Sequence, residues 1–350
     1  CRDLEDVREM DITTCYASVA GTKKHVGTSF SFPENVDEAL QMLHLIAGSE
    51  KAWRERPFVS MSVCHVVPPL KFAEDASACL EAGVRGGMPI LLLSAGQAGA
   101  TSPATLALCV VQAVAEVIAG LVYVNAIQEG APAIFGAWPF VSDLRTGAMS
   151  GGSGEQAVLM AACGQMSQFY NLPSGIAAGM TDSKIPDAQS GYEKGYTVAL
   201  AGHSGANLIY ESAGMHASLL GCCLESYVID NDMLGAINRT VRGIEVNAET
   251  LSLDPIRDVC LDGPGHYLGH EQTLNRMQSD YLYPIVGDRE NINNWIEQGS
   301  TDSIQRAHLK LKEILKTHFP NNWDEDTDRK IREQFPIRLP RNRMQPLDIS

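Results

Sequence analysis

The residues best placed to do chemistry lie between positions 174 and 220. Two short apolar runs, 174–180 and 208–210, each end in polar or ionisable side chains. We expect a helix between them to begin at Pro186, because a proline costs nothing at the first helical position, where the missing N–H has no partner. Such a strand–helix–strand unit places its chemistry at the carboxyl ends of the strands. The candidates there are Met180, Asp182, Lys184, Tyr210, Glu211 and His216.

Aromatic and acidic side chains near predicted strand ends indicate a site for an organic cation. Trp138, Phe140, Tyr192 and Tyr210 offer aromatic faces, and Glu211 offers a counter-charge. Together they could form a cage that holds an alkylammonium ion through cation–π contacts. The alternative is that most of these aromatic residues only pack in the core.

Other motifs carry weaker signals. The glycine-rich segment 151–154 precedes a predicted helix but lacks the spacing of a nucleotide-binding motif, so a flexible turn is the better interpretation. His266 and His270 have the spacing of helical metal ligands, but Gly265 and Gly269 argue against a helix, and no zinc set can be assembled. Lys184 could form a Schiff base, although a lysine just past a strand end is more often a solvated charge.

Composition limits the possible functions. The 350 residues carry a net charge of −15, which argues against a nucleic-acid surface. Nine scattered cysteines without a CxxC motif indicate a reduced, cytoplasmic protein. The longest apolar stretch, 106–127, is interrupted by Gln112, Glu116 and Asn125, so we expect a buried helix and no membrane span.

Strand and helix patterns alternate along most of the chain and predict an α/β fold. Strand patterns occur at 26–32, 58–67, 89–94, 132–138, 174–180 and 208–210, each followed by a helical pattern. This rhythm favours a TIM (β/α)8 barrel over residues 1–246. Residues 247–350 form a C-terminal helical extension, with an amphipathic helix at 301–318 packing on the barrel. Because the chain starts at Cys1 within a charged segment, we expect that an N-terminal part is missing.

Several segments resemble the trimethylamine–corrinoid methyltransferase family. They are residues 95–106, 130–133, 178–184 (AGMTDSK), 210–215 (YESAGM), 241–246 and 263–269. The resemblance runs in order along essentially the whole chain. It implies a TIM barrel that moves a methyl group from a methylated amine to the cobalt of a separate corrinoid protein, in one-carbon metabolism such as methanogenesis. The corrinoid would be carried by that partner protein, and the enzyme would be a cytoplasmic homo-oligomer.

The resemblance also bears on the substrate. Some members act on trimethylamine and carry pyrrolysine, whereas others lack it and act on quaternary amines such as glycine betaine. We place the pyrrolysine position near Met180, and this sequence has only standard residues. A quaternary amine leaves as a neutral tertiary amine without an acid catalyst, so it is the chemically better substrate here. Trimethylamine remains the substrate that the family name indicates.

We therefore expect Met180, Tyr210 and Glu211 to be catalytic. The expected substrate-binding residues are Trp138, Phe140, Asp182, Tyr192, His216, Gln97 and His65, and no bound metal is expected. Two alternatives remain open. One is a TIM-barrel lyase or aldolase that uses Lys184, and the other is an amine-binding protein without catalysis.

Overall fold

Six parallel strands form the centre of the protein. The computed structural model describes residues 3–261, 263–320 and 322–345. The first four strands pair in chain order, and a parallel bridge between Phe135 and Ser174 joins them to the last two. The strands are β1 (Val26–Thr28), β2 (Val59–Val63), β5 (Ile90–Ser94), β7 (Ala133–Ala137), β9 (Gly175–Ala177) and β10 (Leu208–Tyr210). The predicted α/β class with a parallel sheet is confirmed.

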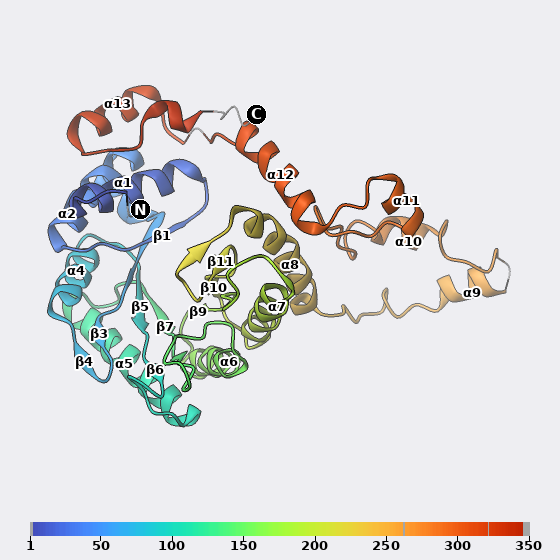
Figure 1. Cartoon of the computed structure of the whole chain (residues 1–350), viewed down its shortest axis with the longest axis horizontal. Helices are drawn as coiled ribbons and strands as arrows, with labels where there is room; N and C mark the ends of the chain where they lie inside the picture. The colour runs from blue at the N-terminus through green and yellow to red at the C-terminus, as the bar shows by residue number, and fades with distance from the viewer. Residues whose placement is uncertain (1–2, 262, 321, 346–350) are drawn as a thin grey trace.

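Helices connect the strands and surround the sheet (Figure 1). Parallel strands need such crossovers because a short turn cannot return the chain to the starting edge. The helices of this part of the chain are α1 (Val7–Gly21), α2 (Pro33–Ala47), α3 (Glu50–Glu55), α4 (Glu74–Arg85), α5 (Leu106–Ile127), α6 (Gly154–Phe169), α7 (Ala188–His203) and α8 (Leu224–Arg242). Short two-residue strands decorate the loops: β3 (Val66–Val67) with β4 (Lys71–Phe72), β6 (Gln97–Ala98) with β8 (Phe140–Val141), and β11 (Met215–His216) with β12 (Gly221–Cys222).

The sheet curls so that its last strand approaches its first two. A Cβ built on Gly27 of β1 would lie 3.7 Å from the ring of Tyr210, which belongs to β10. Nevertheless, β1 and β10 are not paired, and the described residues contain no closed barrel. The described residues thus form a curled, open sheet of six strands, and the (β/α)8 barrel, which needs eight tilted strands, stays a prediction.

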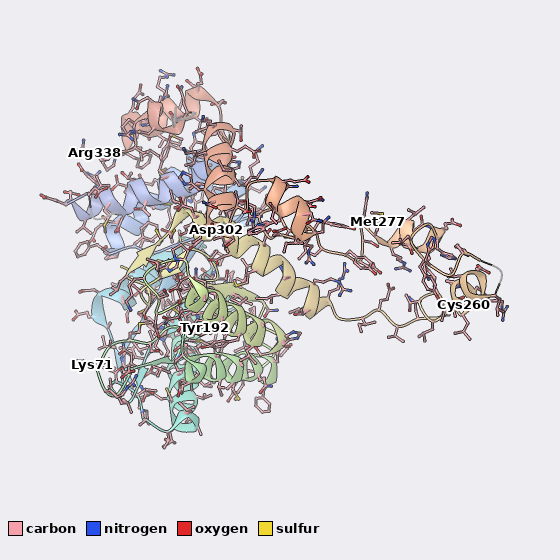
Figure 2. All side chains as sticks on the ribbon, turned by 45° about the vertical axis from the view of Figure 1, so that its right-hand side comes forward. Lys71, Tyr192, Cys260, Met277, Asp302 and Arg338 are labelled. Atoms are coloured by element: carbon pink, nitrogen blue, oxygen red, sulfur yellow. The ribbon has the colours of Figure 1, made fainter. Side chains whose placement is uncertain are left out.

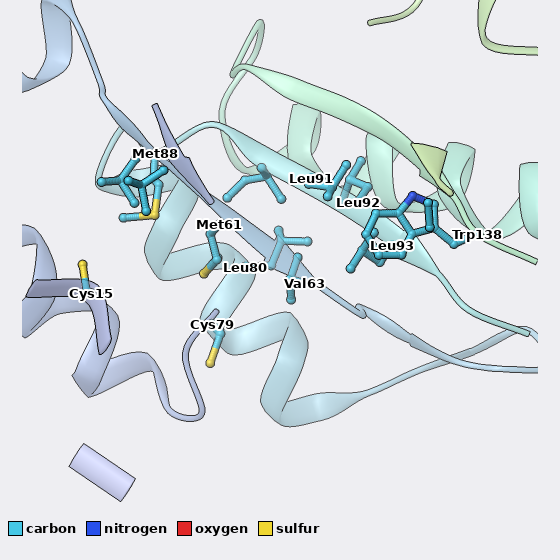
Figure 3. Close-up of a cluster of buried hydrophobic side chains, with 14 of the residues drawn as sticks. Cys15, Met61, Val63, Cys79, Leu80, Met88, Leu91, Leu92, Leu93 and Trp138 are labelled. Atoms are coloured by element: carbon cyan, nitrogen blue, oxygen red, sulfur yellow. The ribbon is translucent and has the colours of Figure 1, made fainter. Parts of the chain in front are cut away.

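Buried apolar side chains fill the space between the sheet and its helices. All five residues of β5 are buried, as expected of a central parallel strand covered on both faces. Met61 and Val63 of β2 lie next to Leu80 of α4 (Figure 3). The packed core therefore fixes the positions of the strands, and the loops at the strand ends lie outside this core.

Three expected element boundaries shift. Helix α7 begins at Ala188 rather than Pro186, because Asp187 caps it and forms a capping box with Ser190. The strand expected at 58–67 divides into β2 and the separate β3. The helix expected after the strand at 208–210 begins only at Leu224.

Helix α5 is less enclosed than expected. By length and composition it is the one helix of the described residues that is long and apolar enough to cross a membrane, and 39% of its most apolar window is buried. Cys109, Val117 and Val124 pack inward, whereas Leu108 and Val122 are exposed. The expectation of a buried helix is thus correct for one face of α5 only.

The C-terminal part consists of a projecting arm and of two helices that pack on the body. Helices α9 (Asp254–Cys260), α10 (Glu271–Arg276) and α11 (Ile292–Glu297) form an arm that projects from the body (Figures 1 and 2). Helix α12 (Ser303–Thr317), predicted at 301–318, packs on α8, and α13 (Glu325–Gln334) packs on α2. The chain thereby returns to its own N-terminal helices. A division of the chain into domains at residue 246 stays a prediction.

A buried ion pair joins α7 to α8 and generates the first prediction. Lys194 and Asp230 are almost fully buried, their charged atoms are 2.6 Å apart, and Asp230 also accepts the Gly214 N–H at 2.7 Å. Lys194→Met should lower the free energy of unfolding in urea by about 3–5 kcal/mol, because it leaves a buried carboxylate unpaired.

Combining Lys194→Met with Asp230→Asn should recover most of this loss, since the amide oxygen still accepts from Gly214 and no charge remains. The exposed pair Arg85–Glu81 provides the control, and Arg85→Met should change stability little. A double variant as unstable as Lys194→Met alone would contradict the prediction.

Candidate functional site

The loops after the parallel strands meet at one edge of the sheet, and predicted site residues gather there. In the sequence, Trp138 and Phe140 follow β7, and Asp182 follows β9. Tyr210 is the last residue of β10, and Glu211 is the next residue in the chain. The sheet positions them because parallel strands paired in chain order all end on the same side. This edge is our candidate site.

Three aromatic rings form a cluster at this edge. The centroid of the Trp138 ring lies 5.4 Å from that of Tyr210 and 6.5 Å from that of Phe140. The Trp138 indole donates a 2.6 Å hydrogen bond to the carbonyl of Gly175, which fixes the ring on β9. Burial raises the pKa of Tyr210, and the neighbouring Ser60 side chain offsets part of that rise. The rings therefore form a rigid, apolar wall.

Glu211 directly follows Tyr210 in the chain and is an unusual carboxylate. It is half-buried, and burial raises its pKa. Within the part of the chain that the structure describes, no hydrogen bond or ion pair to its carboxylate is found. Its φ of +62° is rare for a residue other than glycine and is typical of functional sites. Its charge is felt by the side chain of Tyr227 on α8. An unpaired, partly desolvated carboxylate is suited to a cationic ligand.

Asp182 differs from Glu211 because its carboxylate is hydrogen-bonded within the protein. One oxygen accepts the Ser150 hydroxyl at 2.6 Å, and the other accepts the Gly151 N–H at 2.8 Å and the Ser218 hydroxyl. The carboxylate thus ties the loop after β9 to the loops after β7 and β10. Since the protein itself engages both oxygens, this geometry favours a positioning role over direct contact with a substrate.

Glu193 of α7 completes the same network, and sequence reasoning missed it. Its buried carboxylate accepts the Thr181 hydroxyl at 2.5 Å and the Asp182 N–H at 2.8 Å. Tyr196 of the same helix donates to the Gly152 carbonyl. The signal that could have identified Glu193 is the adjacent charged pair Glu193–Lys194 within a helical pattern that otherwise carries no carboxylate, lysine or arginine. Residues 151–152 are therefore held in place by side chains, so the turn is less flexible than expected.

The loop after β10 has a strained backbone. Positive φ values occur at Glu211, Gly214, Ala217, Ser218 and Leu219. The N–H groups of Ala217 and Ser218 donate to the carbonyls of Ser183 and Thr181, both at 2.9 Å. Such backbone costs about 1–3 kcal/mol per residue and persists only where surrounding contacts impose it. Here the contacts come from the loop after β9, so these two loops set each other's shape.

Other predicted residues lie in or near these loops. Met180 is fully buried and packs beside Gly151. His216 is buried between the Ser226 hydroxyl, at 2.7 Å, and the Ser183 carbonyl, and burial lowers its pKa. Lys184 is exposed, and its amine donates to the Asp182 carbonyl at 2.6 Å.

Tyr192 and His65 lie apart from the aromatic cluster, whereas Gln97 lies opposite Phe140 in the β6–β8 strand pair. Tyr192 is 59% exposed on α7 and stacks on Tyr196 (Figure 2). His65 is buried against α5, where its Nε2 lies 2.9 Å from the Glu116 carbonyl oxygen. Gln97 accepts the Ser142 hydroxyl at 2.8 Å. The structure thus brings together Trp138, Phe140 and Tyr210, with Gln97 opposite Phe140 and Glu211 next to Tyr210 in the chain. The roles of all the predicted residues stay predictions.

The described residues contain no group of three or more His, Cys, Asp or Glu side chains that could hold a metal ion. His270, considered as a metal ligand, instead caps α10 by accepting the N–H of Gln272.

Comparison with known proteins reveals related sequences. The family model described as Trimethylamine methyltransferase (MTTB) matches residues 2–339. Trimethylamine methyltransferase MttB of Desulfitobacterium hafniense is 35% identical over 85% of this chain and 59% of its own length. Glycine betaine methyltransferase of the same species is 29% identical over 94% and 68%, and MttB of Methanosarcina barkeri is 33% identical over 93% and 65%. The chain thus spans 59–68% of the length of these relatives.

One solved structure, that of Mycobacterium tuberculosis Rv1207, covers 66% of this chain and is covered over 87% of its own length, with 13% identity and a TM-score of 0.35. This similarity is too low to assign the fold.

The second prediction concerns Asp182. Asp182→Asn should loosen the loops at 148–153 and 216–220, because an amide presents N–H groups to partners that are themselves donors. Hydrogen bonds to charged groups contribute about 1.5–3 kcal/mol, so amide exchange there should accelerate about 10-fold or more. Hydrogen–deuterium exchange followed by mass spectrometry measures this change.

Asp187→Asn is the matched control, because asparagine also caps a helix and the exchange at both loops should stay unchanged. Equal exchange in Asp182→Asn and the wild type would contradict the role of Asp182.

Proposed function

Because this chain belongs to the trimethylamine methyltransferase family, we propose that the protein moves a methyl group from a methylated amine to the cobalt of a cognate corrinoid protein. The observation that carries this proposal is that an uncompensated carboxylate, Glu211, directly follows Tyr210 of the Trp138–Tyr210 aromatic pair at the carboxyl edge of the sheet. The names of the relatives, which act on trimethylamine or glycine betaine, support a methylated amine as the substrate.

The site chemistry suits a methylated ammonium ion. The methyl groups of such an ion carry part of the positive charge and contact aromatic faces well, each contact contributing about 0.5–2 kcal/mol. Glu211 supplies the counter-charge, and binding a cation would offset the cost of keeping that carboxylate partly out of water. Phe140 extends the aromatic wall beside Trp138.

The methyl transfer depends on the orientation of the substrate toward cobalt and needs no acid or base catalyst. The electron pair of cobalt(I) attacks the methyl carbon, the C–N bond breaks, and its electrons stay on nitrogen. A quaternary amine then leaves as a neutral tertiary amine, so no proton is needed. The protein holds the cation in line and excludes water.

We propose a quaternary amine as the substrate. Met180 fills space beside Gly151, and its thioether offers no group that could activate a tertiary amine. Lys184 is exposed, whereas a Schiff-base lysine usually has its pKa lowered in an apolar pocket, so the lyase alternative gains no support.

The remaining expectations stay proposals. We propose that the curled sheet is part of a (β/α)8 barrel, which is supported by the chain-order pairing of six strands and by the approach of Tyr210 to β1. The corrinoid protein would present its cobalt at the carboxyl edge, because the aromatic cluster lies there. A cytoplasmic location agrees with the reduced cysteines of the described residues.

The third prediction tests Glu211. Glu211→Gln should weaken the binding of glycine betaine, measured by calorimetry, about tenfold or more, because a charge interaction of about 1.4 kcal/mol or more is lost. Wild-type affinity should fall as pH drops through the raised pKa of Glu211, since the protonated carboxyl has no charge, and the affinity of Glu211→Gln should not show this fall.

The same substitution should raise the stability of the ligand-free protein, although it lowers the affinity for the amine. Because burial raises the pKa of Glu211, the native state binds the proton more tightly than the unfolded state does. Stability is therefore lost as pH rises from the ordinary glutamate pKa to the raised one. At pH 7 without ligand, Glu211→Gln should melt at a higher temperature than the wild type. Glu155→Gln, an exposed carboxylate on α6, is the control; an unchanged affinity in Glu211→Gln would contradict the proposal.

The fourth prediction tests the reaction. The protein should methylate cob(I)alamin or a reduced corrinoid protein with glycine betaine or carnitine as donor, and trimethylamine should give little product. Formation of methylcobalt, followed by its absorbance, measures the transfer. Fastest turnover with trimethylamine would overturn the choice of a quaternary amine, and amine binding without any methyl transfer would overturn the catalytic proposal.

A further inference from the structure

The outer surface of three adjacent helices lacks the charges expected of a solvent-facing surface. Helix α5 packs beside α6, and α6 packs beside α7 (Figure 1). Among the described residues of these helices, the one charged side chain on the outside is Glu155. The other charged residues, Glu116, Glu193 and Lys194, point inward and are buried. By contrast, α12 carries five charged residues, and the chain as a whole has 69.

Apolar side chains occupy this surface instead. We call it the uncharged face and define it by the exposed residues Leu108, Val111, Ala115, Val122 and Ala126 of α5, Val158 and Phe169 of α6, and Tyr192 and Leu200 of α7. The α5 residues recur at helical spacing, so they form one continuous stripe. Val111 is 61% exposed, Val122 is 66% exposed and Phe169 is 76% exposed. Contiguous exposed apolar residues of this extent mark an interaction surface.

We propose that the uncharged face is the contact surface between two copies of this chain. Each copy carries a net charge of −15, so two copies repel each other wherever acidic surfaces meet. A face without acidic residues on α5 and α7 is where that repulsion is least. Apolar surfaces of this kind are more typical of permanent homodimers than of transient complexes.

The size of the face also fits a stable dimer. Helix α5 has 22 residues and is about 33 Å long, and α6 and α7 have 16 residues each and are about 24 Å long. At about 10 Å of width for each helix, the three give roughly 800 Å². A stable interface needs about 800 Å² from each partner. Alanines such as Ala115 and Ala126 allow the helices of two copies to approach closely. A two-fold axis would place α5 of one copy against α5 of the other.

Other parts of the same chain are poorly placed to cover this face. Strands β5, β7 and β9 lie between the edge strands β1 and β10, and α5 and α6 are the connections among these inner strands. Helix α12 packs on α8 and α13 packs on α2, and both lie far from α5 (Figure 1). The projecting arm also exposes apolar residues, but it carries more acidic than basic side chains, so it lacks the neutral character of the face.

Sedimentation velocity of the purified protein tests this fifth prediction. The wild type should sediment as a dimer at about 10 μM, and Val111→Glu combined with Val122→Glu should halve the mass, with an unchanged far-UV circular dichroism spectrum. Leu108→Lys combined with Phe169→Lys is a second variant that should give the same result if the first does not fold. Val246→Glu, at a similarly exposed valine in the arm, is the matched control and should remain dimeric.

Three results would overturn the proposal. One is a wild type that is monomeric at 100 μM, another is a face variant that keeps the wild-type mass, and the third is dissociation by Val246→Glu alone. A monomeric wild type that co-sediments with phosphatidylcholine vesicles would assign the face to a membrane surface instead. Amine affinity does not enter these outcomes, so the proposal stands or falls independently of the methyl-transfer function.

Discussion

Parallel pairing of six strands in chain order is the constraint on which the rest of the structure depends. It forces every loop that follows a strand to the same edge of the sheet, and it requires a helix for every return. The aromatic rings of Trp138 and Tyr210 meet at that edge although 72 positions of the sequence separate them. The outer helices then face solvent or a partner. One topological rule thus creates both surfaces that we assign to function.

The carboxylates near the edge differ in one physical respect. Asp182, Glu193 and Asp230 each accept several hydrogen bonds, so their burial is compensated. Glu211 is partly buried without such compensation among the described residues, and its pKa is raised accordingly. Burying an uncompensated charge costs several kcal/mol, which a fold tolerates where a ligand of opposite charge binds. This difference is the reason why we propose Glu211 as a ligand-binding carboxylate, whereas the other three hold loops in place.

The two proposed contact surfaces have opposite chemistry. The carboxyl edge combines aromatic rings with a negative charge and suits a small cation that comes and goes. The uncharged face has aliphatic side chains and almost no charge, which suits a lasting contact. The two lie on different parts of the fold, the loops and the outer helices, so a dimer formed through the face leaves the edge open to a corrinoid protein.

The sequence by itself determined the α/β class, the central strand β5, the helix α12 and the placement of Trp138, Phe140, Tyr210 and Glu211 at strand ends. These features follow from local periodicity and from the rule that chemistry lies at the carboxyl ends of parallel strands. Only the tertiary structure decided that Tyr192 faces outward, that both carboxylate oxygens of Asp182 accept hydrogen bonds from the protein, and that the six strands form an open sheet. Those outcomes depend on helix rotation, on partners such as Ser218, 36 residues from Asp182, and on sheet curvature, because long-range contacts leave no local pattern in the sequence.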